Sequence, residues 1–178
     1  MTNIFKLKLK TQEIQTLIRQ IREQYSEKNL NDNVVNLFIQ KVLEKIALTS
    51  FELLDQRTNG YYSSGIRENY KITVKNGRGT LLYYDKAVAF AEFGVGQIGE
   101  LETDNEIKKL AESFGWRYNV GDKIIRRDGA LDYWVFKLNG RYITFSGYKG
   151  KGFIYDACNA VCQASSLNSI YEEVLANV

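Results

Sequence analysis

The spacing of hydrophobic residues predicts two helices in the first third of the chain. Thr11 suits an N-cap position, and the first apolar stripe then comprises Ile14, Leu17, Ile18, Ile21 and Tyr25. The second stripe, between about Asp32 and Asp55, comprises Val35, Phe38, Ile39, Val42, Ile46 and Leu53. Residues three and four positions apart share one face of a helix. Such stripes usually face the protein core, and packing of both helices between subunits is the alternative.

Alternation of apolar and polar residues predicts two β-hairpins in the middle of the chain. Each turns at an Asn-Gly pair, which is the strongest short-range hairpin signal. The first turn is Asn76-Gly77, with strands near Tyr70–Lys75 and from about Thr80. The second joins the strands Tyr133–Leu138 and Arg141–Phe145. Both hairpins are therefore expected to be antiparallel.

The stretch Ala87–Phe93 is interpreted as a buried strand that continues the first hairpin, because small and aromatic apolar residues run together there. Gly94, Gly96 and Gly99 follow and are expected to form a flexible loop. Their spacing also matches the GxGxxG pattern of dinucleotide-binding proteins. The carboxylates that follow, from Glu100 to Asp104, would repel a pyrophosphate, so this interpretation is weak.

The last part of the chain predicts helices again. One extends from Phe153 to about Ala164 and another from Leu167 to Leu175. A short helix capped by Asp104 or Asn105 precedes the second hairpin. Helices first, strands in the middle and helices last indicate an α+β fold: N-terminal helices, a central antiparallel sheet of two β-hairpins and a C-terminal helix.

Length and composition fit one globular domain spanning residues 1–178. The chain has 44% hydrophobic and 25% charged residues. No apolar run approaches the roughly 20 residues that cross a bilayer. The first residues, Met1–Lys6, lack the apolar core of a signal peptide. We therefore expect no membrane partner and a protein that is made in the cytoplasm.

Candidate catalytic chemistry is sparse. The chain contains no histidine, the commonest general base and metal ligand. Cys158 and Cys162 lie four apart on a predicted helix, and nothing nearby completes a metal site, so two small buried residues are expected. Glu92 could act as a catalytic acid, although a carboxylate that accepts hydrogen bonds from loop amides is the favoured interpretation. No enzymatic activity and no cofactor are expected.

Four motifs resemble the neck or tail-completion proteins at the head-to-tail joint of long-tailed bacteriophages. They are Ser63–Tyr70, similar to that family's "tGxLrxSi"; Ala89–Gly96, similar to "YAxyvEfGTG"; Tyr133–Phe136, similar to "WvY"; and Thr144–Ala157, similar to "tkGxxaxpFmxxA". The chain departs from the pattern in having Val95 where the family usually has Thr, and in lacking its prolines.

The resemblance implies a structural virion protein that forms a ring of six-fold or twelve-fold symmetry at the neck. Its expected partners are further copies of itself, the neighbouring connector, and the tail-tube or terminator proteins. Residues expected at such contacts are Tyr61, Tyr62, Gly65, Glu92, Phe93, Gly94, Gly96, Gly99, Gly147, Gly150 and Gly152. DNA passes through such a ring, and the basic residues expected to face it in passive contact are Arg126, Arg127, Lys149 and Lys151.

A sequence-independent nucleic-acid-binding module is the alternative function. Its basis is Lys6, Lys8 and Lys10, which alternate with apolar residues in an expected edge strand, and the Lys149–Lys151 loop beside Tyr148. A net charge of only +3 weighs against it. So does the acidic run that begins at Glu100.

Overall fold

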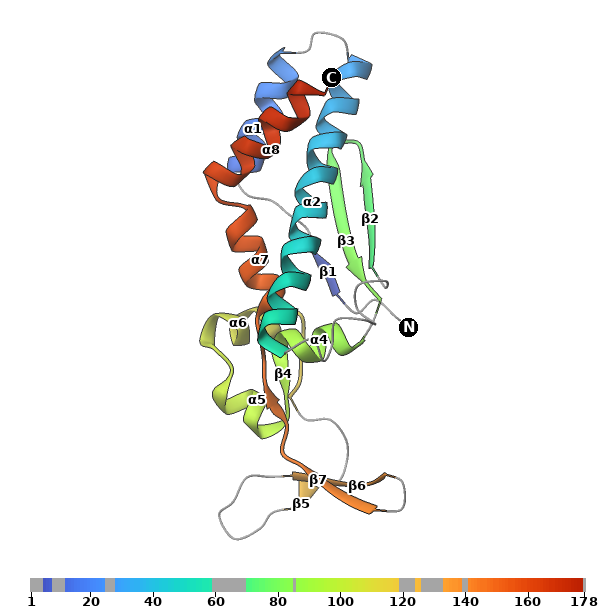
Figure 1. Cartoon of the computed structure of the whole chain (residues 1–178), viewed down its shortest axis with the longest axis vertical. Coiled ribbons are helices and arrows are strands. Elements are labelled where there is room, and N and C mark those ends of the chain that lie inside the picture. Colours follow the sequence, from blue (N-terminus) through green and yellow to red (C-terminus); the bar gives the residue numbers. More distant parts are fainter. Residues whose placement is uncertain are drawn as a thin grey trace. The chain divides into compact units, whose positions relative to one another are not determined.

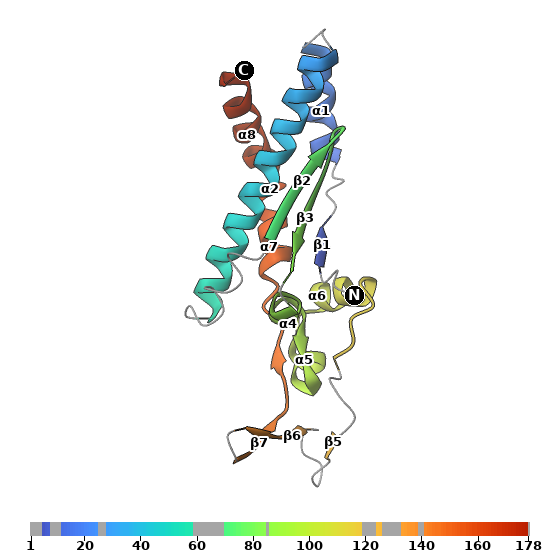
Figure 2. The same ribbon diagram turned by 90° about the vertical axis from the view of Figure 1, so that its right-hand side faces the viewer.

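The computed structural model describes two compact units of the chain (Figures 1 and 2). The described residues are 5–7, 12–24, 28–58, 70–84, 86–118, 124–125, 133–138 and 141–177. Unit 1 comprises Met1–Asp85 together with Phe153–Val178, and unit 2 comprises Lys86–Gly152. Unit 2 is thus inserted into unit 1 along the sequence. Whether the two behave as a single domain stays a prediction.

A 31-residue helix, α2 (Lys28–Thr58), organises unit 1. The helices α1 (Gln12–Gln24), α7 (Phe153–Val161) and α8 (Ala164–Ala176) contact it. In Figure 1, α7 and α8 lie on one side of α2 and the strands β2 and β3 lie on the other. The helix is therefore covered from two directions.

The coverage of α2 explains which of its residues are buried. Five of the six residues of the predicted stripe are buried, whereas Leu53 is only half-buried and Leu54 is buried in its place. Val34, Leu43, Ala47 and Phe51 are buried as well, outside the predicted stripe. A helix that packs against partners on two sides needs apolar residues on both. Four residues of the predicted stripe of the first helix, Ile14, Leu17, Ile18 and Ile21, are confirmed as buried in α1, whereas Tyr25 lies outside the described residues.

The sheet of unit 1 has the strand order β1-β3-β2, and all its pairs are antiparallel. Its strands are β1 (Phe5–Leu7), β2 (Tyr70–Lys75) and β3 (Arg78–Tyr83). The first predicted hairpin is therefore confirmed, and so is the edge position of the N-terminal strand.

The hairpin turn is set by its two residues and by a contact with α2. Asn76 and Gly77 have φ angles of 53° and 68°, and positive φ at both positions is the requirement of a type I′ turn. The Gly77 amide donates a hydrogen bond of 2.9 Å to the Asn36 side chain. Farther along, a Cβ on Gly79 would come within 2.6 Å of Leu43 Cδ1, so β3 lies directly on the helix.

One buried polar contact also joins α2 to β3. The Ser50 hydroxyl is fully buried, donates to the Ala47 carbonyl at 2.7 Å, and lies 2.9 Å from the Tyr83 hydroxyl. Since the Ser50 proton is used within the helix, Tyr83 is the donor to Ser50. Both hydroxyls therefore have partners in the core, as buried polar groups require.

Unit 2 contains short elements. The helices are α4 (Lys86–Phe93), α5 (Gly96–Glu102) and α6 (Asn105–Ser113). The strands are β4 (Gly94–Val95), β5 (Ile124–Ile125), β6 (Tyr133–Leu138), β7 (Arg141–Phe145) and β8 (Tyr148–Lys149). They form one sheet of order β5-β6-β7 and a two-stranded sheet of β4 and β8.

The expected strand over Ala87–Phe93 is wrong, because these residues form the helix α4. Ala87, Ala89 and Ala91 favour a helix, since alanine has the highest helix propensity. The segment is apolar almost throughout, and Val88 and Phe93 are buried. A short apolar run that is buried this fully has no period that separates a helix from a strand.

The α+β fold class is confirmed, with N-terminal helices, two antiparallel hairpins and C-terminal helices. The two hairpins lie in separate three-stranded sheets, β1-β3-β2 and β5-β6-β7, rather than in one sheet. The expected helix cap is also present, since the Asp104 side chain accepts a hydrogen bond from the Glu106 amide at 2.9 Å. The helix predicted to end near Ala164 ends at Val161.

A leucine-to-alanine substitution at each of two positions on α2 tests the role of this helix as the core of unit 1. Leu43 is fully buried, whereas Leu48 is 55% exposed. We expect Leu43→Ala to lower the free energy of unfolding by about 2–5 kcal/mol, because it removes buried methyl groups and leaves a cavity. Leu48→Ala is expected to change it by less than about 0.5 kcal/mol. Urea unfolding followed by far-UV circular dichroism measures both, and equal effects would contradict the assignment of α2 as the core helix.

Candidate functional site

Most of the predicted contact residues of unit 2 gather where two glycine-rich segments meet. We call residues 91–96 and 146–152 together the glycine clasp. Its centre is the antiparallel pair β4 and β8, in which Gly94 lies opposite Lys149 and Val95 opposite Tyr148. Segments far apart in the sequence thus form one element.

The glycines of the clasp allow the two backbones to touch. A Cβ on Gly150 would lie 2.5 Å from the Phe93 carbonyl carbon and 2.7 Å from the backbone carbonyl oxygen of Glu92. A Cβ on Gly94 would lie 2.7 Å from the backbone carbonyl oxygen of Tyr148. Real Cβ atoms do not approach backbone so closely, so a side chain at either position would force the segments apart.

Hydrogen bonds close the clasp on the side of α4. The Lys151 amide donates to the Ala91 carbonyl at 2.7 Å, and the Gly152 amide donates to the Glu92 carbonyl at 3.0 Å. The Thr103 hydroxyl accepts a 2.8 Å hydrogen bond from the Gly150 amide and donates to the Phe93 carbonyl at 3.4 Å. Thr103 is 3% exposed. One buried side chain therefore bridges the two segments of the clasp.

Aromatic residues cover the clasp. The Trp116 indole N–H donates to the Gly94 carbonyl at 3.1 Å. Its ring centroid lies 5.6 Å from that of Phe93 and 5.2 Å from that of Phe90. Phe114 lies 5.9 Å from Phe93 and is 45% exposed. The clasp thus has an aromatic rim that reaches the surface.

The sequence analysis did not single out Thr103 or Trp116. Thr103 stands in an acidic run, where it looks like an ordinary surface residue. The signal for Trp116 is stronger, because a buried tryptophan N–H usually needs an acceptor. The free carbonyl of a nearby glycine is a natural candidate, but only the fold brings Gly94 within reach.

The structure places the predicted contact residues as follows. Glu92, Phe93, Gly94, Gly96, Gly99, Gly150 and Gly152 are buried, and Gly147 is half-buried. Tyr61, Tyr62 and Gly65 lie outside the described residues. The buried members contact other parts of unit 2, so they shape the unit from within. Their expected contacts with other subunits stay a prediction.

Among the residues predicted to face DNA, Lys149 is exposed and Lys151 is half-buried. Arg126 and Arg127 lie outside the described residues. The structure therefore places Lys149 in the central strand pair of the clasp and Lys151 just after it, and it does not describe the two arginines.

The GxGxxG pattern does not form a phosphate cradle. The Gly96 amide donates to the Tyr118 carbonyl at 2.6 Å, so it is not available to a phosphate. Gly94 and Gly99 are buried against β8. The glycines serve backbone packing instead, and the loop expected to be flexible is formed by β4 and the start of α5.

Other candidate chemistry is also accounted for in the described part of the chain. Within it, no three His, Cys, Asp or Glu side chains are grouped so as to hold a metal ion. Cys158 and Cys162 are not joined in a disulfide and are half-buried, less than the full burial expected. Glu92 is fully buried. None of the described helices is long and apolar enough to span a membrane.

No protein-family model matches this chain, and neither the curated proteins nor the solved structures include a significant match.

Two glycines with positive φ test the clasp. Gly147 (φ 99°) and Gly115 (φ 69°) both adopt a backbone that favours glycine, but a Cβ on Gly147 would collide with the Val95 carbonyl whereas one on Gly115 would meet nothing within 4 Å. Alanine at either site costs about 1–2 kcal/mol of backbone energy. We expect Gly147→Ala to destabilise unit 2 by at least about 2 kcal/mol more than Gly115→Ala.

Tryptophan fluorescence measures this difference, because both tryptophans of the chain, Trp116 and Trp134, belong to unit 2. The unfolding midpoints of the two variants are compared in urea. Equal midpoints would show that the close approach at Gly147 is not needed.

Tyr118 makes the stability of unit 2 depend on alkaline pH. Burial, and then the negative charges of Glu112 and Glu100, raise the pKa of its phenol above the ordinary value of 10.0. The folded state thus holds this proton more tightly than the unfolded state, so the stabilisation is complete below pH 10 and is lost as pH rises through the folded pKa. Tyr118→Phe should lose less stability than the wild type between about pH 9 and 11.

Comparing the wild type with Tyr118→Phe separates the effect of Tyr118 from that of the lysines, which titrate in the same pH range and are present in both chains. Among the described residues, the Tyr118 hydroxyl has no hydrogen-bond partner, so Tyr118→Phe should fold normally at pH 7. Parallel curves of unfolding midpoint against pH for the two chains would refute this contribution.

Proposed function

We propose that this protein is a structural component of a phage-type virion and forms a ring at the joint between head and tail. In this role it connects the tail to the connector and surrounds the path of the DNA. The observation that carries the proposal is the glycine clasp, because it is built from two of the four motifs that resemble neck and tail-completion proteins.

Those two motifs, Ala89–Gly96 and Thr144–Ala157, were identified separately along the sequence. Their glycines interlock in the clasp, where Gly94 and Gly150 exclude side chains from each other's backbone. Chance similarities in two distant segments would have no reason to depend on one another. Their mutual fit supports a common origin of the two motifs in one structural element.

The surfaces of the two units suit a ring. A closed ring uses heterologous contacts, in which one patch of a subunit meets a different patch of the next. Large apolar side chains are exposed on both units, at Leu48 and Tyr84 in unit 1 and at Leu101 and Phe114 in unit 2. These side chains are available for such contacts.

A nucleic-acid-binding module remains the second candidate, favoured by the exposure of Lys149 beside Tyr148 on β8. A passive DNA path and a dedicated binding module differ in strength. Contacts with only a few phosphates give weak binding, and salt weakens it further because each phosphate contact releases counterions. Binding of short duplex DNA that persists at about 200 mM salt would therefore favour the module.

Electron microscopy of purified particles tests the proposed position. The protein carries a tag at its carboxyl terminus, and particles labelled through that tag are averaged in two dimensions. We expect label at the junction of head and tail, and the symmetry of the averaged ring gives the number of copies. An untagged particle preparation is the control for nonspecific label.

Particles that assemble fully without this protein, or that carry no label, would overturn the structural role. The nucleic-acid-binding module would then become the leading function, and the salt dependence of DNA binding would be the next measurement.

A further inference from the structure

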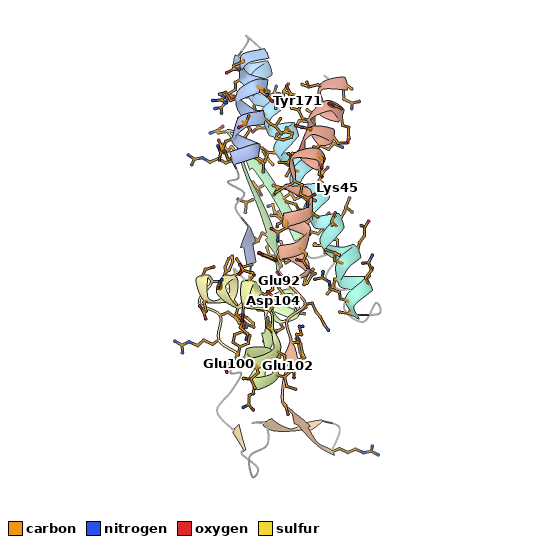
Figure 3. All side chains as sticks on the ribbon, turned by 90° about the vertical axis from the view of Figure 1, so that its left-hand side faces the viewer. Lys45, Glu92, Glu100, Glu102, Asp104 and Tyr171 are labelled. Carbon is orange, nitrogen blue, oxygen red and sulfur yellow. The ribbon has the colours of Figure 1, made fainter. Side chains whose placement is uncertain are left out.

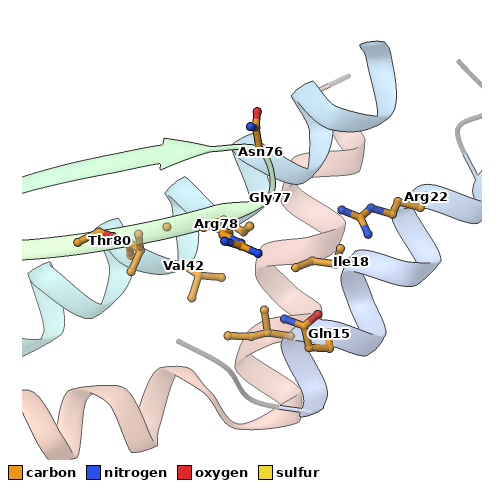
Figure 4. A pocket seen from close by; sticks show the side chains of 12 residues that line it. Gln15, Ile18, Arg22, Val42, Asn76, Gly77, Arg78 and Thr80 are labelled. Carbon is orange, nitrogen blue, oxygen red and sulfur yellow. The ribbon is translucent and has the colours of Figure 1, made fainter. Parts of the chain in front are cut away.

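Unit 1 contains a cleft of about 730 Å³ between α1, α2 and the hairpin of β2 and β3 (Figure 4). Its floor is aliphatic and is formed by Ile14, Ile18, Ile39, Val42 and Leu43. Its polar lining residues include Gln15, Asn76 and Thr80. The volume falls within the roughly 300–1,000 Å³ of ordinary binding pockets, so several side chains of a partner could enter it.

The charge of the cleft is one-sided. Arg22 from α1 and Arg78 from β3 are exposed and line it, and none of its lining residues is acidic. Figure 4 shows Arg22 directed toward the hairpin turn at Gly77. Guanidinium groups pair well with carboxylates through two parallel hydrogen bonds. An apolar floor with two arginines therefore fits an apolar side chain that has carboxylates beside it.

The end of α5 in unit 2 presents that combination. Leu101 is 61% exposed, more than any other large apolar residue in the described part of the chain. Glu100 and Glu102 flank it and are exposed, with no ion pair among the described residues, and Asp104 follows (Figure 3). The Lys108 ammonium donates to the Leu101 carbonyl at 3.2 Å, which anchors the backbone behind the exposed leucine.

We propose that the cleft of one subunit binds Glu100-Leu101-Glu102 of a second copy of this chain. Leu101 occupies the aliphatic floor, and the two glutamates pair with Arg22 and Arg78. Each subunit carries one cleft and one such segment, so the contact repeats head to tail and can close a ring. This inference rests on the proposed function, for which it supplies the contact between neighbouring subunits.

DNA is a poorer occupant of the cleft. The floor residues are at most 7% exposed, so the apolar surface of the cleft is small, but phosphates would pair with the two arginines alone and would leave that surface uncovered. The contact is also smaller than the roughly 1,000 Å² that a stable pair of proteins needs. It therefore fixes the orientation of neighbouring subunits, and other surfaces add to the ring contact.

Charge reversal tests the contact in the purified full-length chain. The double variants Arg22→Glu with Arg78→Glu, and Glu100→Arg with Glu102→Arg, each place like charges face to face. We expect each to weaken self-association at least about tenfold, since such juxtaposition opposes binding. The variant with all four substitutions should recover to within about threefold of the wild type. Sedimentation velocity over a range of concentrations measures all four chains.

Two single charge reversals outside the contact serve as controls, and each changes the net charge by half as much as a double variant. Arg19→Glu changes an arginine of α1 that does not line the cleft, and Glu112→Arg changes an exposed glutamate of α6. Neither should alter self-association by more than about twofold. Thermal unfolding of every variant shows whether it folds.

Cysteine cross-linking keeps the test decisive if a charge variant fails to fold. With Cys158→Ala and Cys162→Ala in every chain to remove the native thiols, a chain with both Arg78→Cys and Leu101→Cys should give a ladder of covalent oligomers under mild oxidation. A mixture of the two single variants should give dimers only, because each chain then carries one half of the contact. Homodimers from either single variant alone would count against a head-to-tail arrangement.

The inference is overturned if both double reversals leave self-association unchanged. It is also overturned if the fourfold variant fails to recover self-association and no covalent ladder forms. A loss of DNA binding in place of self-association in Arg22→Glu with Arg78→Glu would overturn it as well. Its failure is distinct from failure of the proposed function. Label at the neck with unaffected association would leave the virion role intact and remove only this contact. Self-association through the contact, with no label on particles, would support the contact and remove the virion role.

Discussion

The structure of unit 2 depends on direct contact between two backbones. The glycine clasp joins residues near the start of the inserted segment, which begins at Lys86, to those at its end at Gly152. A long insertion normally has to fix its ends at an entropic cost that grows with loop length. Pairing β4 with β8 brings the ends together, and Trp116 adds a hydrogen bond to Gly94 and a ring contact with Phe93. Thr103 then makes the contact specific, because a single hydroxyl satisfies groups on both strands.

Unit 1 follows a different principle. Its long helix α2 buries residues on two sides, one toward α7 and α8 and the other toward the hairpin. Burial of large side chains such as Phe38 and Leu43 supplies the main favourable free energy, at roughly 25 cal/mol per Å² of apolar area. Gly79 and the Asn36–Gly77 hydrogen bond then set how closely the hairpin lies on the helix. The same close packing leaves a cleft beside the turn, where α1 diverges from β3.

These two arrangements bear on the proposed ring in different ways. The clasp buries most of the glycines that the resemblance assigns to contacts, and so makes unit 2 a firm support for the exposed end of α5. The cleft gives unit 1 a surface of complementary chemistry. If the two meet between subunits, the specificity of assembly comes from a few charges around one leucine, and the strength of the ring comes from the other surfaces that add to this contact.

The sequence alone predicted the elements whose signals are local. The Asn76-Gly77 hairpin, the capping of α6 by Asp104 and the apolar stripe of α1 depend on residues a few positions apart, so short-range chemistry determines them. The helix α4 was mistaken for a strand because it is short and apolar almost throughout, and such a run has no period that separates a helix from a strand. The buried glycines, the bridging role of Thr103 and the cleft between Arg22 and Arg78 could not be predicted. Each joins segments far apart in the chain, and only tertiary packing decides which backbones touch and which charges share a surface.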